Sequence, residues 1–122
     1  MYPPKSTGIV SAAKKLLSGL KVNKKSIDAI ILVTQTPDYF QPATAAYLHG
    51  LLNLPESCAA FDVNQGCAGY VYGLWLAYMM IESASCKNVL LSKCDIYYLN
   101  QEEINNNRDY LIEKLDKNKN YL

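Results

Sequence analysis

The chain has 122 residues, of which 50% are hydrophobic and 19% charged, and its formal net charge is +1. This length suits one domain, and the composition is typical of globular proteins. A net charge this small gives no reason to expect nucleic acid or an anionic membrane surface as a partner.

The first predicted element is a helix over residues 6–20. Apolar residues recur there with a helical period, which places them on one face opposite lysines. They are Ile9, Ala12, Ala13, Leu16, Leu17 and Leu20. The lysines between positions 5 and 25 have no acidic residue among them. We interpret them as a solvated helix face and loop, with a basic binding patch as the less favoured alternative.

A continuous run of aliphatic residues at 29–33, Ala-Ile-Ile-Leu-Val, predicts the first strand. Such a run suits a strand that is covered on both faces, as in a parallel sheet. Residues 34–42 contain prolines and aromatic residues and predict a loop. A second helix is expected over about 43–52, because Pro55 bars its continuation.

The same alternation continues in the next part of the chain. Residues 59–63 predict a second strand, Gly66 a sharp turn, residues 67–83 a helix, and residues 88–92 a third strand. The resulting order of helix and strand, repeated three times, is that of a layered α/β fold with right-handed crossovers.

No charged residue lies between Asp62 and Glu82. The first part of this stretch is polar, which leaves about 15 apolar residues, fewer than the roughly 20 that a membrane-spanning helix needs. We therefore expect a buried core helix and no membrane partner.

The composition changes near residue 96, where the chain becomes rich in Asn, Lys and Glu. We expect residues 1–95 to form the folded part and residues 96–122 a divergent polar tail, either a weak helix or disordered. The spacing that favours the helix is that of Ile104, Arg108, Leu111 and Leu115.

The cysteines Cys58, Cys67, Cys86 and Cys94 form no C-x-x-C pair, and His49 is the only histidine. A metal site is therefore not expected, and no cofactor is predicted. The opening residues lack the apolar core of a signal peptide, so we expect a cytoplasmic protein with free thiols.

Cys67 lies where a predicted strand turns into a predicted helix. Free backbone N–H groups and the positive end of the helix dipole favour an anion there, so a thiolate would be a better nucleophile. Gly66 allows the turn, and Gly69 is expected to keep the first helical turn clear of an incoming substrate. A cysteine suits acyl transfer because one thioester replaces another. Position alone leaves open an inert buried thiol, the interpretation we favour for the other cysteines.

Residues 26–42, SIDAIILVTQTPDYFQP, and residues 60–70, AFDVNQGCAGY, resemble the 3-oxoacyl-ACP synthase III (ketoacyl synthase III) family of the thiolase-like superfamily. Gly73, Leu74 and Ala77 extend the resemblance. It implies a partial thiolase-like layered α/β fold, in which residues 1–95 are part of the N-terminal half. It also implies decarboxylative condensation of an acyl thioester with malonyl-ACP through an acyl-cysteine intermediate.

The resemblance gives roles to particular residues. It implies that Cys67 is acylated by acyl-CoA or an acyl-carrier thioester, and that the Cys67 backbone N–H supplies half of the oxyanion hole. Phe40 falls near the loop through which the family reaches across its homodimer to line the other subunit's acyl pocket. The implied partners are acyl-CoA and malonyl-acyl carrier protein, with no metal and no prosthetic group.

The sequence also departs from the family. The family's catalytic histidine and asparagine, and the glycine that completes its oxyanion hole, lie beyond Leu122, and His49 does not correspond to that histidine. We therefore expect a truncated copy, and a catalytically incomplete fragment without turnover is the alternative to an active acyltransferase. A caspase-type protease is a weaker match, because residues 65–69 half-fit its signature but its upstream histidine is missing.

Overall fold

The computed structural model describes residues 5–93, 96–102, 104–106, 108 and 112–113. Helices and strands alternate along most of these residues. They are α1 (Lys5–Gly19), the 3₁₀ turn η1 (Lys24–Ser26), β1 (Ala29–Val33), α2 (Thr44–Leu51), β2 (Ala59–Val63), the 3₁₀ turn η2 (Gly66–Ala68), α3 (Gly69–Glu82), β3 (Asn88–Ser92) and β4 (Ile96–Asn100). The helices α1 to α3 and the strands β1 to β3 lie within about two residues of their predicted positions.

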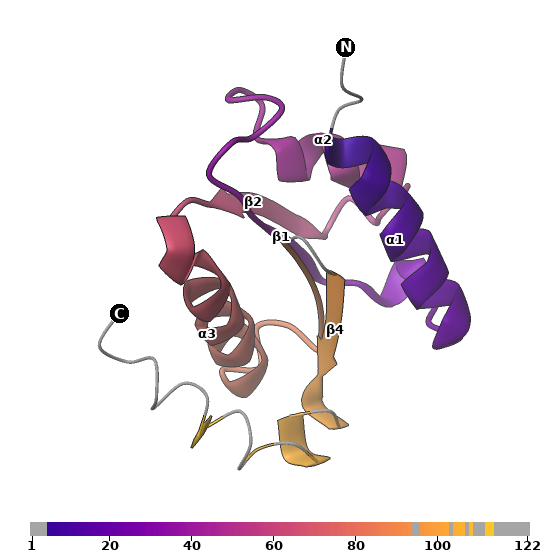
Figure 1. Ribbon diagram of the computed structural model, residues 1–122. Coiled ribbons are helices and arrows are strands. Elements are labelled where there is room, and N and C mark those ends of the chain that lie inside the picture. The colour runs from indigo at the N-terminus through magenta and orange to yellow at the C-terminus, as the bar shows by residue number, and fades with distance from the viewer. Residues whose placement is uncertain (1–4, 94–95, 103, 107, 109–111, 114–122) are drawn as a thin grey trace.

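The strands form one sheet in the order β2-β1-β3-β4. β1 lies between β2 and β3 and is parallel to both, with Ala29 opposite Ala59 on one side and opposite Val89 on the other. Figure 1 shows α1 and α2 on one face of this sheet and α3 on the opposite face. The arrangement is a helix–sheet–helix sandwich, so the predicted layered α/β fold is confirmed.

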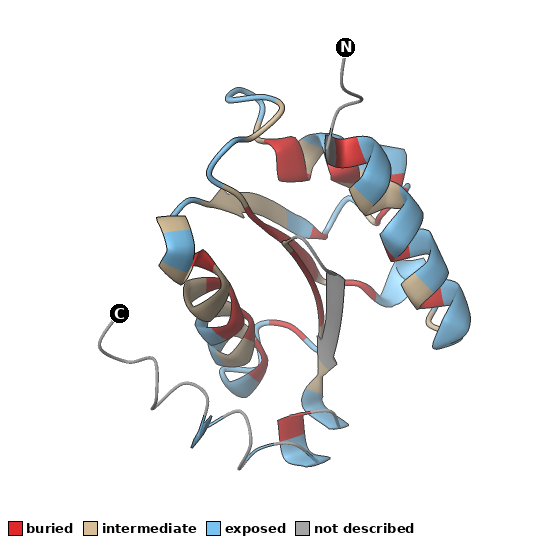
Figure 2. Ribbon diagram, viewed as in Figure 1, coloured by how far each residue is buried: buried red, intermediate tan, exposed pale blue. Residues whose placement is uncertain are grey.

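β1 is buried at every position, because its side chains alternate between two hydrophobic cores (Figure 2). Ile31 and Val33 belong to the core under α3. Ile30 and Leu32 belong to the core under α1 and α2. Each isoleucine removed from water stabilises the fold by roughly 1.5–3 kcal/mol. The apolar run was therefore correctly interpreted as a strand covered on both faces.

The helix α3 buries only the side that faces the sheet. Leu74, Ala77 and Ile81 are buried there, whereas Trp75 is 42% exposed and Met79 is 45% exposed. The prediction of a buried core helix thus holds for one side of α3. Among the described residues, no helix is long and apolar enough to cross a bilayer.

Asp28 joins the starts of β1 and β3. Its N–H donates to the carbonyl oxygen of Asn88 at 2.9 Å. Its carboxylate accepts hydrogen bonds from the N–H groups of Lys87 at 2.8 Å and Asn88 at 3.0 Å. These bonds fix the end of the sheet that lies farthest from the carboxyl ends of the parallel strands.

The strand β4 is a feature that the sequence did not predict, because residues 96–100 were assigned to the polar tail. β4 runs antiparallel to β3, with Asn88 opposite Asn100 and Ser92 opposite Ile96. Beyond it Ile104 is helical and fully buried, in the core under α3. The chain after residue 95 therefore continues the fold, and the rest of the predicted tail, including Leu111 and Leu115, lies outside the described residues.

Candidate functional site

Cys67 occupies the middle of η2, between the end of β2 and the start of α3. Its side chain is exposed. Gly66, immediately before it, has a φ of 56°, in the left-handed region that favours glycine. The sharp turn predicted at Gly66 is therefore confirmed, and the thiol lies two residues ahead of Gly69, where a helix of 14 residues begins.

The backbone hydrogen bonds of this turn do not use the N–H of Cys67. The N–H of Ala68 donates to the carbonyl oxygen of Gln65 at 3.2 Å, and the N–H of Gly69 donates to that of Gly66. The N–H of Cys67 donates no hydrogen bond to any described residue. An unused N–H beside an exposed thiol, at the positive end of a helix dipole, is suited to stabilise a developing negative charge.

Gly69 has a different role from the one predicted. It is buried, and a Cβ built on it would lie 2.6 Å from Cγ1 of Val33 in β1. Real Cβ atoms do not approach other atoms so closely, so a glycine is needed for the start of α3 to lie against the sheet. The expectation that Gly69 clears space for a substrate is thus corrected, because Val33 fills that space.

Asp62, in β2, fixes the start of α2. Its two carboxylate oxygens accept hydrogen bonds from the N–H groups of Thr44 at 3.0 Å and Ala45 at 2.8 Å. The carboxylate satisfies helix N–H groups that have no partner within the helix, and its charge complements the helix dipole. Asp62 is not among the site residues predicted from the sequence, although an acidic residue inside a predicted strand is an unusual feature that points to a special role.

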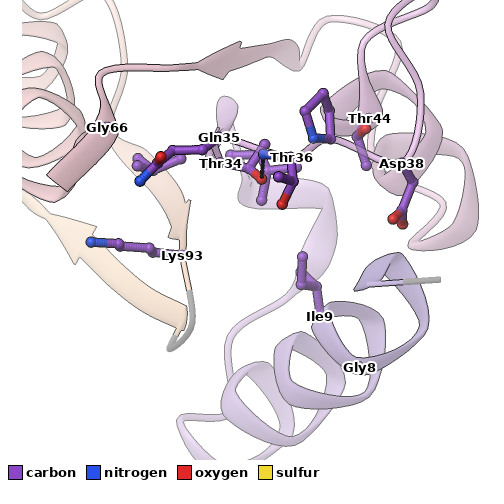
Figure 3. Close-up of a pocket in the computed structure, with 12 residues that line it drawn as sticks. Gly8, Ile9, Thr34, Gln35, Thr36, Asp38, Thr44, Gly66 and Lys93 are labelled. Carbon is purple, nitrogen blue, oxygen red and sulfur yellow. Dashed lines mark hydrogen bonds between the residues drawn. The ribbon is translucent and has the colours of Figure 1, made fainter. Parts of the chain in front are cut away.

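A cavity of about 530 Å³ opens beside the cysteine turn (Figure 3). It is lined by the first two turns of α1, by the end of β1 with the loop that follows it, and by Thr44, Gly66 and Lys93. Its size is that of an ordinary small-molecule pocket. Gly66 is the residue through which the cavity reaches the turn that carries Cys67.

The middle of the loop between β1 and α2 is hydrogen-bonded to both neighbouring helices, α1 and α2. Asp38 accepts a hydrogen bond from the N–H of Ser6 in the first turn of α1 at 2.8 Å. The hydroxyl of Thr44 accepts a hydrogen bond from the N–H of Tyr39 at 3.1 Å. The wall of the cavity is therefore tied to α1 and α2, and sequence analysis, which assigned residues 34–42 only as a loop, did not find it.

Two other cysteines lie in the interior. Cys58 is 7% exposed, and burial together with the nearby charge of Asp28 raises the pKa of its thiol to about 11. Burial and Asp28 also raise the pKa of Cys86. At neutral pH both thiols stay protonated, which agrees with the interpretation of these cysteines as inert. Cys94 lies outside the described residues.

His49 and Phe40 lie apart from the cysteine turn in the sequence and differ in their surroundings. The Nε2 atom of His49 lies 2.7 Å from the carbonyl oxygen of Pro55 and donates to it, which closes the loop after α2. Phe40 is 92% exposed, in the loop between β1 and α2. The imidazole is thus engaged in structure, whereas the Phe40 ring is free to contact another molecule.

Residues 61–105, which include Cys67, match the family model described as 3-oxoacyl-[acyl-carrier-protein (ACP)] synthase III. A Campylobacter jejuni protein named as a 3-oxoacyl-[acyl-carrier-protein] synthase 3 is 54% identical over 80 residues, which are 66% of this chain and 23% of that protein. The beta-ketoacyl-[acyl-carrier-protein] synthase III of Coxiella burnetii is 38% identical over 90 residues, 74% of this chain and 28% of the relative.

Solved structures agree with these matches. The 3-oxoacyl-(acyl-carrier protein) synthase of Burkholderia xenovorans is 46% identical and superimposes with a TM-score of 0.70, over 73% of this chain and 26% of that one. OleA of Xanthomonas campestris is 27% identical, with a TM-score of 0.69, over 72% of this chain and 26% of that one. The chain thus has a partial thiolase-like fold and spans about a quarter of the length of the relatives it matches.

Proposed function

Because the chain is a relative of the 3-oxoacyl-[acyl-carrier-protein] synthase III enzymes in sequence and in fold, we propose that its Cys67 accepts an acyl group from a carrier thioester. One observation carries the proposal: an exposed thiol stands beside an uncommitted backbone N–H where β2 turns into α3. Acyl transfer needs both features: a nucleophile, and a hydrogen-bond donor for the carbonyl oxygen that becomes negative.

In the proposed step, the sulfur of Cys67 forms a bond to the carbonyl carbon of the thioester. The carbonyl oxygen becomes an oxyanion, and the Cys67 N–H is placed to donate a hydrogen bond to it. The bond between the carbonyl carbon and the carrier sulfur then breaks. The carrier leaves as a thiol with the proton from Cys67, so one thioester replaces another and the acyl group stays activated.

The function proposed for the whole family member is decarboxylative condensation with malonyl-acyl carrier protein. Malonyl-acyl carrier protein loses carbon dioxide, the resulting carbanion attacks the acyl carbon on Cys67, and the cysteine leaves as a thiolate that takes up a proton from water. The acyl donor is acyl-CoA, and the active form is a cytoplasmic homodimer. Phe40, which is 92% exposed, is available for contact with a second subunit.

This chain carries the acyl-accepting half of that reaction. The groups that the resemblance implies for the second half, a histidine and an asparagine, are not among its residues at matching positions. We therefore expect acylation without condensation from the chain by itself. We keep the division of the chain into residues 1–95 and 96–122 only as a change in amino-acid composition. β4 belongs to the same sheet as β1 to β3, and Ile104 belongs to the core under α3.

The test is incubation with acetyl-CoA, followed by intact-mass measurement and peptide mapping. We expect one acetyl group on the peptide that contains Cys67, and none in the variant Cys67→Ser. The buried thiols of Cys58 and Cys86 serve as controls within the same chain, since non-specific acetylation would label unfolded molecules at these positions too. An unmodified Cys67 after prolonged incubation would favour the catalytically incomplete fragment and overturn the proposal.

A further inference from the structure

We propose that the cavity beside Cys67 selects an ω-carboxyacyl thioester, whose terminal carboxylate pairs with Lys93. This rests on the proposed acyl transfer to Cys67 and adds to it the class of acyl group. Such a group carries the thioester carbonyl at one end and a carboxylate at the other, joined by a short apolar chain. Neither the cavity nor Lys93 was identified from the sequence.

The position of the cavity points to a ligand. β1 leads through the loop at residues 34–43 to α2 and then to β2 on one side, whereas β3 lies on the other side of β1. In open α/β sheets, ligands bind outside the carboxyl ends of the parallel strands where the connections diverge in this way. The cavity lies there, since Val33 at the end of β1 and Lys93 after β3 both line it.

The two charged residues that line the cavity differ in whether their charged group already has a hydrogen-bond partner. They belong to Asp38 and Lys93. The carboxylate of Asp38 accepts a hydrogen bond from the N–H of Ser6 at the start of α1. Lys93 is half-buried, and within the described part of the chain it forms neither an ion pair nor a hydrogen bond. A half-buried ammonium without a partner favours an anionic ligand.

The side chains around Lys93 suit the remainder of such a ligand. In Figure 3 the Lys93 side chain and the Gln35 amide extend toward the side of the cavity where Gly66 lies, next to Cys67. Leu32 and Val33 supply apolar wall beside them. A chain of methylene groups fits this wall, and a methyl-terminated acyl group of the same length would leave the ammonium desolvated and unpaired.

The experiment compares succinyl-CoA with butyryl-CoA, which have four acyl carbons each and differ in a terminal carboxylate against a methyl group. The rate of acyl addition to Cys67 is followed by intact mass. We expect succinyl transfer to be at least about fivefold faster, the effect of one charge-assisted contact at a half-buried site. Because both donors carry the same CoA, contacts of its phosphates cancel in the ratio.

Variants of Lys93 test whether this residue causes the preference for succinyl-CoA over butyryl-CoA. Lys93→Met should bring the ratio of the two rates to about one, mainly by slowing succinyl transfer, and Lys93→Arg should retain the preference. The matched control is Lys15→Met, which removes an exposed lysine of α1 and should leave the ratio unchanged. Equal rates in the unmodified chain, or a preference that survives Lys93→Met, would overturn the proposal.

A second measurement separates this proposal from the proposed function. In ¹⁵N-labelled Cys67→Ser, which cannot form a thioester, monomethyl succinate should shift the amide resonances of Gln35 and Lys93, and methyl butyrate should not. If neither CoA ester acylates Cys67 but these shifts occur and vanish in Lys93→Met, acyl transfer is wrong and the carboxylate site stands. If acylation occurs without these shifts and without a succinyl preference, acyl transfer stands and the carboxylate site is wrong.

Discussion

Gly73 of α3 lies so close to Val33 of β1 that no side chain fits between them. A Cβ built on Gly73 would stand 2.5 Å from Cγ2 of Val33 and 2.9 Å from Cδ1 of Leu91. Together with Gly69, one helical turn earlier, this glycine sets the distance between α3 and the sheet. The same contact therefore determines where Cys67, at the head of α3, stands relative to the strand ends.

Substitution of Gly73 should lower stability. Gly73→Ala gains the higher helix propensity of alanine, about 1 kcal/mol, but forces atoms of two strands to move, which at contacts this short costs about 2–3 kcal/mol. We expect a net loss of roughly 1–2 kcal/mol in the free energy of unfolding, measured in urea. Gly50→Ala in α2, where nothing lies within 4 Å, is the control and should be neutral or stabilising. Equal effects of the two variants would contradict the close-packing argument.

Removal of the Asp62 charge should loosen the start of α2. Asp62→Ala takes away the acceptor for the N–H groups of Thr44 and Ala45. Loss of a helix cap of this kind costs about 1–2 kcal/mol. The measurement is again the free energy of unfolding in urea, with Glu56→Ala, an exposed acidic residue in the loop before β2, as the control. A loss in Glu56→Ala as large as that in Asp62→Ala would point to net charge as the cause.

Truncation of Ile104 tests whether the chain beyond β4 belongs to the core. Ile104 is fully buried, and Ile104→Ala should cost about 2–4 kcal/mol, by loss of burial and creation of a cavity. Ile112 is 39% exposed, so Ile112→Ala should cost less than about 1 kcal/mol. Thermal unfolding followed by circular dichroism would distinguish the two. Equal melting temperatures for both variants would mean that Ile104 does not pack as described.

Stability should fall in alkaline solution because of Cys58. Its pKa is about 11 in the folded chain, above the 9.0 of an ordinary thiol, since burial disfavours the thiolate. The unfolded chain loses this proton first, so the stabilisation is complete below pH 9 and is lost between pH 9 and 11. Urea unfolding at pH 8 and pH 10.5 should show the decline, and Cys58→Ala should show a smaller one. An identical pH dependence in both proteins would rule out this origin.

Much of the fold could be predicted because local pattern and tertiary environment agree. The run from Ala29 to Val33 has no polar residue, and such a segment is stable only when both of its faces are covered. The turn at Gly66 could be predicted equally well. A glycine between a strand and a helix indicates a sharp turn, whose left-handed backbone conformation would be strained for a residue with a side chain.

Other features depend on residues that are distant in sequence. Asp62 is 18 positions from Thr44 and 17 from Ala45, the residues whose N–H groups it accepts hydrogen bonds from, and the sequence around Asp62 does not indicate these contacts. β4 was missed because residues 96–100 were judged by the polar composition that follows them, whereas their place is set by pairing with β3. The role of Gly69 was misjudged for a similar reason, since Val33, its neighbour in space, lies 36 positions away (69 minus 33).

The register between Ala29 and Val89 has a consequence for biosynthesis. The hydrogen bond between Asp28 and Asn88 closes 60 positions of chain, and it joins a strand made early to one made late. Long-range closures of this kind are slow and leave their strands unpaired in the meantime. While the ribosome is still translating α3, β1 has only β2 beside it. The other edge of β1 stays unpaired, and accessible to chaperones or to aggregation, until β3 has been synthesised.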